Sequence, residues 1–244
     1  MRKFLLVGAT SAIARGVARM AAERGDALFL VGRSESKVNA EAADLRVRGA
    51  KVGTFIMDLT DLSKHVELLD AAEKAMGGLD TVLIAHGTLT DQTVAQKDVG
   101  VLETEFQTNF LSSAALLTHI ANRFEARRAG SIAVITSVAG DRGRQSNYVY
   151  GSAKAALSAF LSGLRNRLAK ANVDVIDIRP GFVDTPMTAS VPKNPLFAQP
   201  DAVGRSIYKA IEKRRSVVYL PWFWALIMFA VRSVPEPLFK KLKL

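Results

Sequence analysis

A serine, a tyrosine and a lysine with side chains that can move a proton lie within one short stretch. Ser137 precedes Tyr150 by thirteen residues, and Lys154 follows the tyrosine four residues later. Residues four apart project from the same face of a helix. An ammonium beside a phenol favours the phenolate and lowers a pKa that is ordinarily about 10. We expect the pair to protonate a substrate oxygen, the alternative being an ordinary helix-surface contact.

The elements that would position these residues alternate along the whole chain. Apolar runs predict strands, and amphipathic stretches between them predict helices. The strands fall near residues 3–7, 27–31, 51–57, 81–85, 131–136, 173–178 and 217–220. The helices fall near residues 12–24, 35–48, 62–76, 98–127, 147–170 and 201–213. This order predicts a parallel α/β sheet covered on both faces, with ligands at the carboxyl ends of its strands.

The turn after the first expected strand is built of small residues and opens a helix. It starts at Gly8 and includes Ala12, Ile13 and Ala14. Backbone N–H groups and the helix dipole at such a turn suit a pyrophosphate. A dinucleotide loop usually has glycine at the two alanine positions, so an ordinary strand-to-helix turn remains the alternative.

Arg33 stands just beyond the second expected strand, where an NAD enzyme would carry an acidic residue. A guanidinium pairs with a 2′-phosphate, so we expect NADP(H), a solvated arginine being the alternative. Asp58, after the third strand, suits either an adenine amine or a helix N-cap.

The composition of the chain excludes some kinds of functional site. The chain has 244 residues, which suits one domain, and no cysteine, which excludes thiolate catalysis. Its three histidines are far apart, so we expect no metal. The net charge is +10, and nine Lys or Arg against two Glu lie within residues 202–244. The basic character therefore belongs mostly to the C-terminal part.

Taken together, these residues resemble the short-chain dehydrogenase/reductase family over nearly the whole chain. The resemblance rests on Gly8, Asp58, Ala85-His86-Gly87, Asn109, Ser137, Tyr150 with Lys154, and Pro180-Gly181. It implies one Rossmann-type, doubly wound parallel sheet of seven strands in the order 3-2-1-4-5-6-7. It also implies a homodimer or homotetramer that pairs through helices 98–127 and 147–170. The family usually has Asn-Ala-Gly where this chain has Ala85-His86-Gly87, and we expect His86 to stabilise this turn.

The resemblance implies a role for each site residue. Tyr150 would give a proton to a substrate carbonyl, Ser137 would hold its oxygen, Lys154 would lower the tyrosine pKa, and Asn109 would position a water for proton relay. The implied cofactor contacts are Gly8, Thr10, Ser11, Ala12, Ile13, Arg33, Asp58, Leu59, Gly87, Tyr150, Lys154, Pro180, Gly181, Val183 and Thr185.

Residues 139–150 and the tail from Leu226 also resemble a narrower group, the reductases of decaprenylphosphoryl-2-keto-pentose. That resemblance implies reduction of a keto sugar on a polyprenyl phosphate, a step of cell-envelope synthesis. Expected substrate contacts are Arg142, Arg144, Tyr148 and Phe182, with a phosphate role for one or both arginines. Solvated loop arginines are the alternative, and residues 181–200 are expected to form a lid.

The tail, residues 221–244, is predicted to be a helical extension of the reductase domain at residues 1–220. Residues 221–231 are almost wholly apolar and include Trp222 and Trp224, and cations follow. They are too short to span a bilayer and suit either a membrane interface or a buried helix. Nucleic acid is disfavoured, because the cations border an apolar run. We expect a cytoplasmic protein, peripheral on the membrane if the tail meets lipid.

Two other functions share part of this pattern. A soluble reductase of small or acyl-carrier ketones would need the same catalytic residues. A non-catalytic NADP-binding sensor would need no Ser137, Tyr150 and Lys154 together, which disfavours it.

Overall fold

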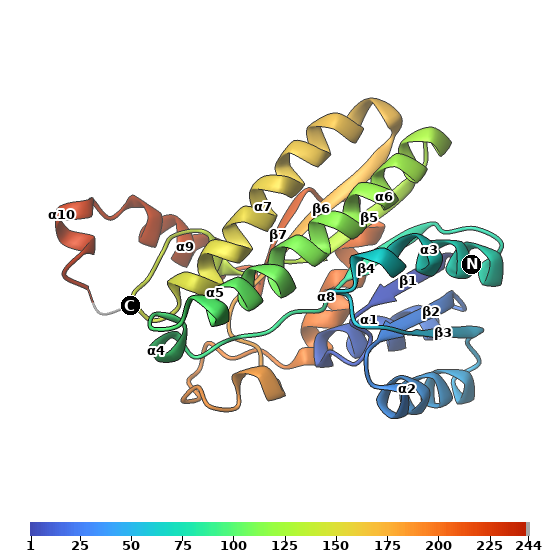
Figure 1. The fold of residues 1–244 in the computed structure, drawn as a ribbon, viewed down its shortest axis with the longest axis horizontal. Helices are drawn as coiled ribbons and strands as arrows, with labels where there is room; N and C mark the ends of the chain where they lie inside the picture. The colour runs from blue at the N-terminus through green and yellow to red at the C-terminus, as the bar shows by residue number, and fades with distance from the viewer. Residues whose placement is uncertain (243–244) are drawn as a thin grey trace.

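Seven parallel strands form one sheet in the order β3-β2-β1-β4-β5-β6-β7, as predicted. The computed structural model describes residues 1–242, and Figure 1 shows the sheet with helices on both sides. The strands are β1 (Lys3–Val7), β2 (Ala27–Gly32), β3 (Val52–Ile56), β4 (Thr81–Ile84), β5 (Gly130–Ile135), β6 (Val173–Pro180) and β7 (Val217–Leu220).

The strands are apolar on both faces because both faces are covered. Along β1, Leu5 and Val7 pack toward the helices at residues 65–76, 112–127 and 148–168. Phe4 and Leu6 pack toward the helices at residues 12–23, 35–47 and 200–212. This alternation follows from the two-residue period of a strand. A continuous apolar run is therefore what a buried parallel strand requires.

The helices follow the predicted pattern with two differences. They are α1 (Ala12–Glu23), α2 (Glu35–Val47), α3 (His65–Met76), α4 (Gln92–Ala95), α5 (Val99–Phe106), α6 (Ser112–Arg127), α7 (Tyr148–Leu168), α8 (Pro200–Glu212), α9 (Trp224–Ser233) and α10 (Glu236–Phe239). The short α4 was not predicted. The helix expected over residues 98–127 is instead α5 and α6 joined by a π turn, Gln107–Leu111.

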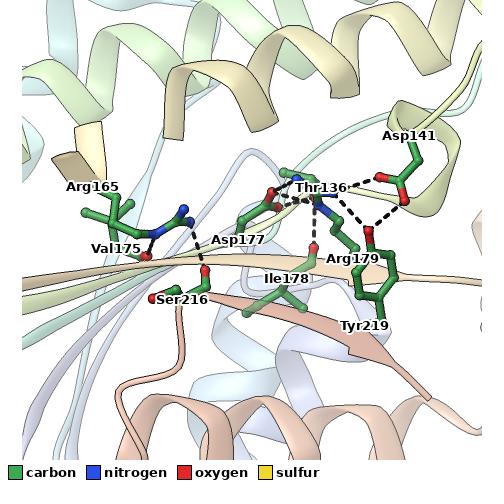
Figure 2. A network of polar contacts seen from close by, with 9 residues as sticks. All are labelled: Thr136, Asp141, Arg165, Val175, Asp177, Ile178, Arg179, Ser216 and Tyr219. Carbon is green, nitrogen blue, oxygen red and sulfur yellow. Dashed lines mark hydrogen bonds and ion pairs between the residues drawn. The ribbon is translucent and has the colours of Figure 1, made fainter. Parts of the chain in front are cut away.

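A buried polar network fastens the carboxyl ends of β5 and β6 to β7 (Figure 2). The Arg179 guanidinium donates to Asp177 Oδ2 at 2.8 Å and to Asp141 Oδ1 at 2.9 Å. The Tyr219 hydroxyl donates to Asp141 Oδ2 at 2.7 Å, and Thr136 donates to Asp177. Burial opposes the charge of Arg179, but Asp177 and its other partners raise the pKa of Arg179 above its usual range. The network therefore holds a permanent cation between two almost fully buried carboxylates.

We predict that Arg179→Met lowers the free energy of unfolding by about 3 to 5 kcal/mol, because it leaves two buried carboxylates without their cation. Arg167→Met is the matched control, since it breaks an exposed ion pair with Glu125 and should cost under about 1 kcal/mol. Urea denaturation of the three proteins measures both values. Similar losses in the two variants would show that the Arg179 network does not stabilise the fold as described.

Candidate active site

Ser137, Tyr150 and Lys154 meet at the carboxyl edge of the sheet. Ser137 follows β5 and its Oγ accepts a hydrogen bond from Ala139 N at 3.0 Å. Tyr150 lies in the first turn of α7, and Lys154 lies one turn later. The Lys154 Nζ is 5.8 Å from the centroid of the Tyr150 ring, so the two side chains share one face of the helix as expected.

The phenol of Tyr150 keeps its proton in this environment. Burial raises the pKa of Tyr150 to about 12; the Ser137 hydroxyl acts to lower it, and the Glu105 carboxylate to raise it. The sequence predicted a lowered value because of Lys154. The outcome differs because burial penalises the phenolate and the ammonium is directed elsewhere.

Lys154 is 4% exposed and donates from Nζ to the Ile135 carbonyl oxygen at 3.2 Å. Burial lowers the pKa of Lys154 to about 8, while Glu105 and Asp177 act to raise it. The amine of Lys154 is therefore mostly charged at neutral pH, but its pKa lies much closer to 7 than the pKa of a surface lysine does.

Asn109 lies in the π turn and is fully buried. Its amide nitrogen donates to Glu105 Oε1 at 2.8 Å and to the Thr88 carbonyl oxygen at 3.2 Å. A Cβ on Gly87 would lie 2.5 Å from Asn109 Oδ1 and 3.4 Å from Lys154 Nζ, so only glycine fits between them. The side chain of Asn109 thus fastens the loop after β4, and its role in a water relay stays a prediction.

Glu105 is the site residue that the sequence analysis missed. It is 1% exposed, and its carboxylate also accepts hydrogen bonds from the hydroxyls of Thr88 and Thr90. Its spacing of four residues before Asn109 was a signal, since such residues share a helix face. A carboxylate at that position is ordinarily solvated, and so the sequence alone did not single it out.

His86 has the structural role that was predicted for it. Its Nε2 lies 2.8 Å from Ser112 Oγ, which joins the loop after β4 to the start of α6. Burial, with the nearby Lys154 charge, lowers the pKa of His86 to about 3. The imidazole is neutral at physiological pH and cannot serve there as an acid.

The turn between β1 and α1 fits a dinucleotide phosphate. Gly8 has φ of 79°, and a Cβ there would lie 2.5 Å from His86 N, so the turn needs glycine. Ser11 precedes α1 but makes no side-chain cap, which leaves the N–H groups of the first turn open to a ligand. Thr10 is exposed beside this turn, and Ala12 and Ile13 begin the helix.

Arg33 and Asp58 follow β2 and β3 at the same edge. Arg33 is exposed. Asp58 Oδ1 accepts hydrogen bonds from Thr60 N at 2.9 Å and Thr60 Oγ1 at 2.7 Å, and both lower the pKa of Asp58. Asp58 therefore stabilises a turn and does not act as a helix N-cap. The carbonyl of Leu59 accepts a hydrogen bond from His65 Nε2 at 2.9 Å.

The segment after β6 packs against the tail. A Cβ on Gly181 would lie 1.9 Å from Trp224 Cε2, so the indole occupies the space beside the glycine. Phe182 stacks on Phe197 at 5.2 Å between ring centroids and meets Trp224 edge-on at 5.4 Å. Val183 forms an isolated β-bridge with Ala198, which joins the two ends of the segment expected to be a lid. Between them, Thr185 precedes a short helical turn at Pro186–Thr188.

The predicted substrate contacts differ in their surroundings. Arg142 donates to the carbonyl oxygens of Val231 at 2.7 Å and Val234 at 2.6 Å, so its guanidinium holds the tail. Arg144 Nε is buried and has no hydrogen-bond partner within residues 1–242. Burial lowers the pKa of Arg144, with Asp141 acting in the opposite direction. Tyr148 is 42% exposed at the start of α7.

Comparisons with known proteins agree with this geometry. Residues 2–196 match the family described as short chain dehydrogenase. An uncharacterised oxidoreductase of Mycobacterium tuberculosis is 34% identical over 239 residues, covering 98% of this chain and 96% of the relative. One of Streptomyces coelicolor is 32% identical over 242 residues, covering 99% and 96%.

Two solved structures share the fold. The 3-oxoacyl-[acyl-carrier protein] reductase of Brucella melitensis, in complex with NAD, superposes with a TM-score of 0.80 at 25% identity, covering 93% of this chain and 98% of its own. A variant of the actinorhodin polyketide ketoreductase with NADPH gives a TM-score of 0.80 at 20% identity, covering 91% and 97%. The names of these four proteins do not mention a sugar on a polyprenyl phosphate.

We predict that wild-type stability relative to Lys154→Met rises with pH between about 8 and 10.5. Below pH 8 the amine is charged in both the folded and unfolded states; above it the folded protein loses the proton first, so rising pH favours folding. The stability difference should change by roughly 2 kcal/mol between pH 7 and 9.5. Urea denaturation at both pH values measures it, with the exposed Lys51→Met as control. An unchanged difference would contradict the lowered pKa.

Proposed function

Because the chain belongs to the short-chain dehydrogenase family and is an oxidoreductase, we propose that it reduces a ketone to an alcohol with NADPH. One observation carries the proposal: the half-buried phenol of Tyr150, whose pKa burial raises, lies beside the Ser137 hydroxyl and shares a helix face with the buried ammonium of Lys154. An acid of this kind serves a reaction in which a carbonyl oxygen gains a proton.

Ser137, Tyr150 and Lys154 each have a different role in the reduction of the carbonyl. A bound nicotinamide cofactor supplies hydride to the carbonyl carbon. The Ser137 hydroxyl binds the carbonyl oxygen, and Tyr150 donates its proton to that oxygen as negative charge develops there. The Lys154 charge then stabilises the phenolate that remains, which offsets the burial that keeps the pKa of the resting phenol at about 12. Burial of both groups strengthens this interaction, because little water screens it.

The proposal names NADPH because of the residue that follows β2. Arg33 is exposed there, and a guanidinium can make charge-assisted bonds to a 2′-phosphate. The loop at Gly8 and the open N-terminus of α1 are suited to the pyrophosphate. The two similar structures contain NAD in one case and NADPH in the other, so the preference rests on Arg33.

For the substrate, we propose a keto sugar carried on a polyprenyl phosphate. The support is Arg144, whose Nε is buried with no hydrogen-bond partner within residues 1–242. A partly buried guanidinium with an unpartnered Nε suits an anionic group of the substrate. The apolar rings of Phe182 and Phe197 lie on the segment that borders the site and suit an apolar carrier.

A second candidate is a ketone on an acyl carrier. The similarity to the Brucella reductase of 3-oxoacyl groups favours it. Such a carrier also bears a phosphate, so Arg144 alone does not separate the two. The two candidates are distinguished by the ketone that the enzyme reduces, which is a keto sugar in one case and a 3-oxoacyl group in the other.

We predict that the purified chain oxidises NADPH in the presence of a ketone and that Tyr150→Phe lowers kcat by at least about a hundredfold, because the general acid is lost. Absorbance of the reduced nicotinamide measures turnover. Tyr208→Phe is the matched control, because the Tyr208 hydroxyl bonds Asp26 outside the site, and it should keep most of the activity. Full turnover by Tyr150→Phe would favour a nucleotide-binding sensor, and faster oxidation of NADH than NADPH would contradict the cofactor preference.

We predict that Arg144→Met raises KM about tenfold to a hundredfold for keto sugars and 3-oxoacyl compounds that carry a phosphate, through loss of charge-assisted hydrogen bonds. Phosphate-free forms of the same ketones should be affected little. Arg205→Met removes an exposed arginine of α8 and is the control. Equal rises with and without phosphate would exclude the phosphate role, and a preference for 3-oxoacyl compounds would favour the acyl-carrier reductase.

A further inference from the structure

The first eight residues of helix α9 are all apolar, but only one side of the helix is covered. Trp224 and Met228 are 3% and 1% exposed and pack with Val138 in a small cluster. Ile227 and Val231 lie partly buried against the same cluster. This inner side anchors α9 to the residue that follows Ser137, at the end of the molecule where α7 begins (Figure 1).

The opposite side of α9 leaves large apolar side chains in solvent. Trp222 is 72% exposed, Leu226 is 64% exposed and Phe229 is 74% exposed. Leu226 and Phe229 are three residues apart and share one side of α9, and Trp222 lies in the turn that precedes the helix. Leu238 in α10 is 59% exposed as well. A cluster of this size, including a tryptophan, indicates a surface that contacts something apolar.

The charges around this outer face are positive. Arg232, Lys240 and Lys241 are exposed. Glu236 is the one acidic residue within residues 221–244 of the sequence, and it pairs with Arg142 at 2.9 Å. The Arg142 guanidinium also lies 3.5 Å from the centroid of the Phe239 ring, which fixes α10 beside the end of α9. The exposed apolar side chains are therefore close in the chain to three exposed cations that form no ion pair within residues 1–242.

We propose that this outer face of residues 222–241 docks on the surface of an anionic lipid membrane. An apolar face bordered by cations matches the acyl boundary and the phosphate headgroups of such a bilayer. None of the helices within residues 1–242 is long and apolar enough to cross a membrane. At about 1.5 Å a residue, the ten residues of α9 suit a helix that lies in the interface.

The charges also favour lipid over a second copy of the chain. A two-fold dimer places the same patch of both subunits together. Arg232, Lys240 and Lys241 of both subunits would then gather at one contact, and the repulsion among these cations would oppose it. Anionic lipid headgroups would instead attract these cations.

Docking would bring the active site to the lipid surface. Helix α9 follows β7, whose carboxyl end lies at the same edge of the sheet as Ser137 and Tyr150, and it packs on Val138 and Phe182. A substrate with an apolar chain could then reach Tyr150 while its chain stays in the bilayer. This step rests on the proposed function, whereas the docking itself does not.

The test measures binding of the full chain to vesicles of phosphatidylglycerol and phosphatidylcholine, and to vesicles of phosphatidylcholine alone, by co-sedimentation. No substrate or cofactor is present, so the result is independent of reductase activity. The chain has two tryptophans, and Trp224 is buried, so a blue shift of emission on binding reports Trp222. Circular dichroism confirms that each variant is folded.

The wild-type chain should bind the anionic vesicles, and Leu226→Ser with Phe229→Ser should weaken binding at least tenfold and abolish the blue shift. Lys240→Gln with Lys241→Gln should weaken binding about thirtyfold at low salt, at about fivefold for each charge. Val47→Ser with Val66→Ser is the matched control, since it removes exposed apolar side chains from α2 and α3, and it should bind as the wild type does.

Two outcomes would overturn the proposal. One is a wild-type chain that stays in the supernatant, or a Leu226→Ser, Phe229→Ser variant that binds equally well. The other is a wild-type dimer in light scattering that this variant converts to a monomer without any binding to vesicles, which would make the face a contact between copies.

Discussion

The guanidinium of Arg179, held between the carboxylates of Asp141 and Asp177, is the interaction on which the catalytic edge of the sheet depends. A charge buried this far is stable only with partners in good geometry, so the three side chains fix one another. Thr136, which donates to Asp177, directly precedes Ser137, and Asp141 follows the short turn that holds Ser137. Ser137 is therefore held in the chain between two residues of this network, Thr136 and Asp141.

Burial is also the common cause of the unusual acidities in the site. It raises the pKa of Tyr150 and lowers those of Lys154 and His86. All three shifts favour the neutral form, which is what a dry environment does to each of these groups. Glu105, buried beside Asn109, acts on both Tyr150 and Lys154. The resting site thus keeps a proton on the phenol and has a lysine that titrates near neutral pH.

Much of the fold could be predicted from the sequence, because buried parallel strands and amphipathic helices have distinct periods. The seven strands were predicted in this way, with ends within a few residues, whereas their order was implied by the family resemblance. The π turn at Asn109 was not, since a one-residue change in helix pitch leaves the apolar pattern almost unchanged. The short α4 was missed because four residues are too few for a helical period.

The site could be predicted only in part. Spacing placed Tyr150 and Lys154 on one helix face, but spacing carries no information on burial, so the direction of the Tyr150 pKa was wrong. Arg142 and Arg144 are two residues apart and looked alike, yet one holds α9 and α10 and the other has a buried Nε without a partner within residues 1–242. Only the position of the tail distinguishes them, and that position depends on long-range packing.

Trp224 connects the tail to the residues around Ser137 by packing. Its indole fills the space beside Gly181 and packs on Val138, the neighbour of Ser137. Protein interiors are close-packed, so a displacement of the helix is transmitted to the residues that it touches rather than absorbed. A displacement of α9 would therefore also displace Val138, the residue next to Ser137.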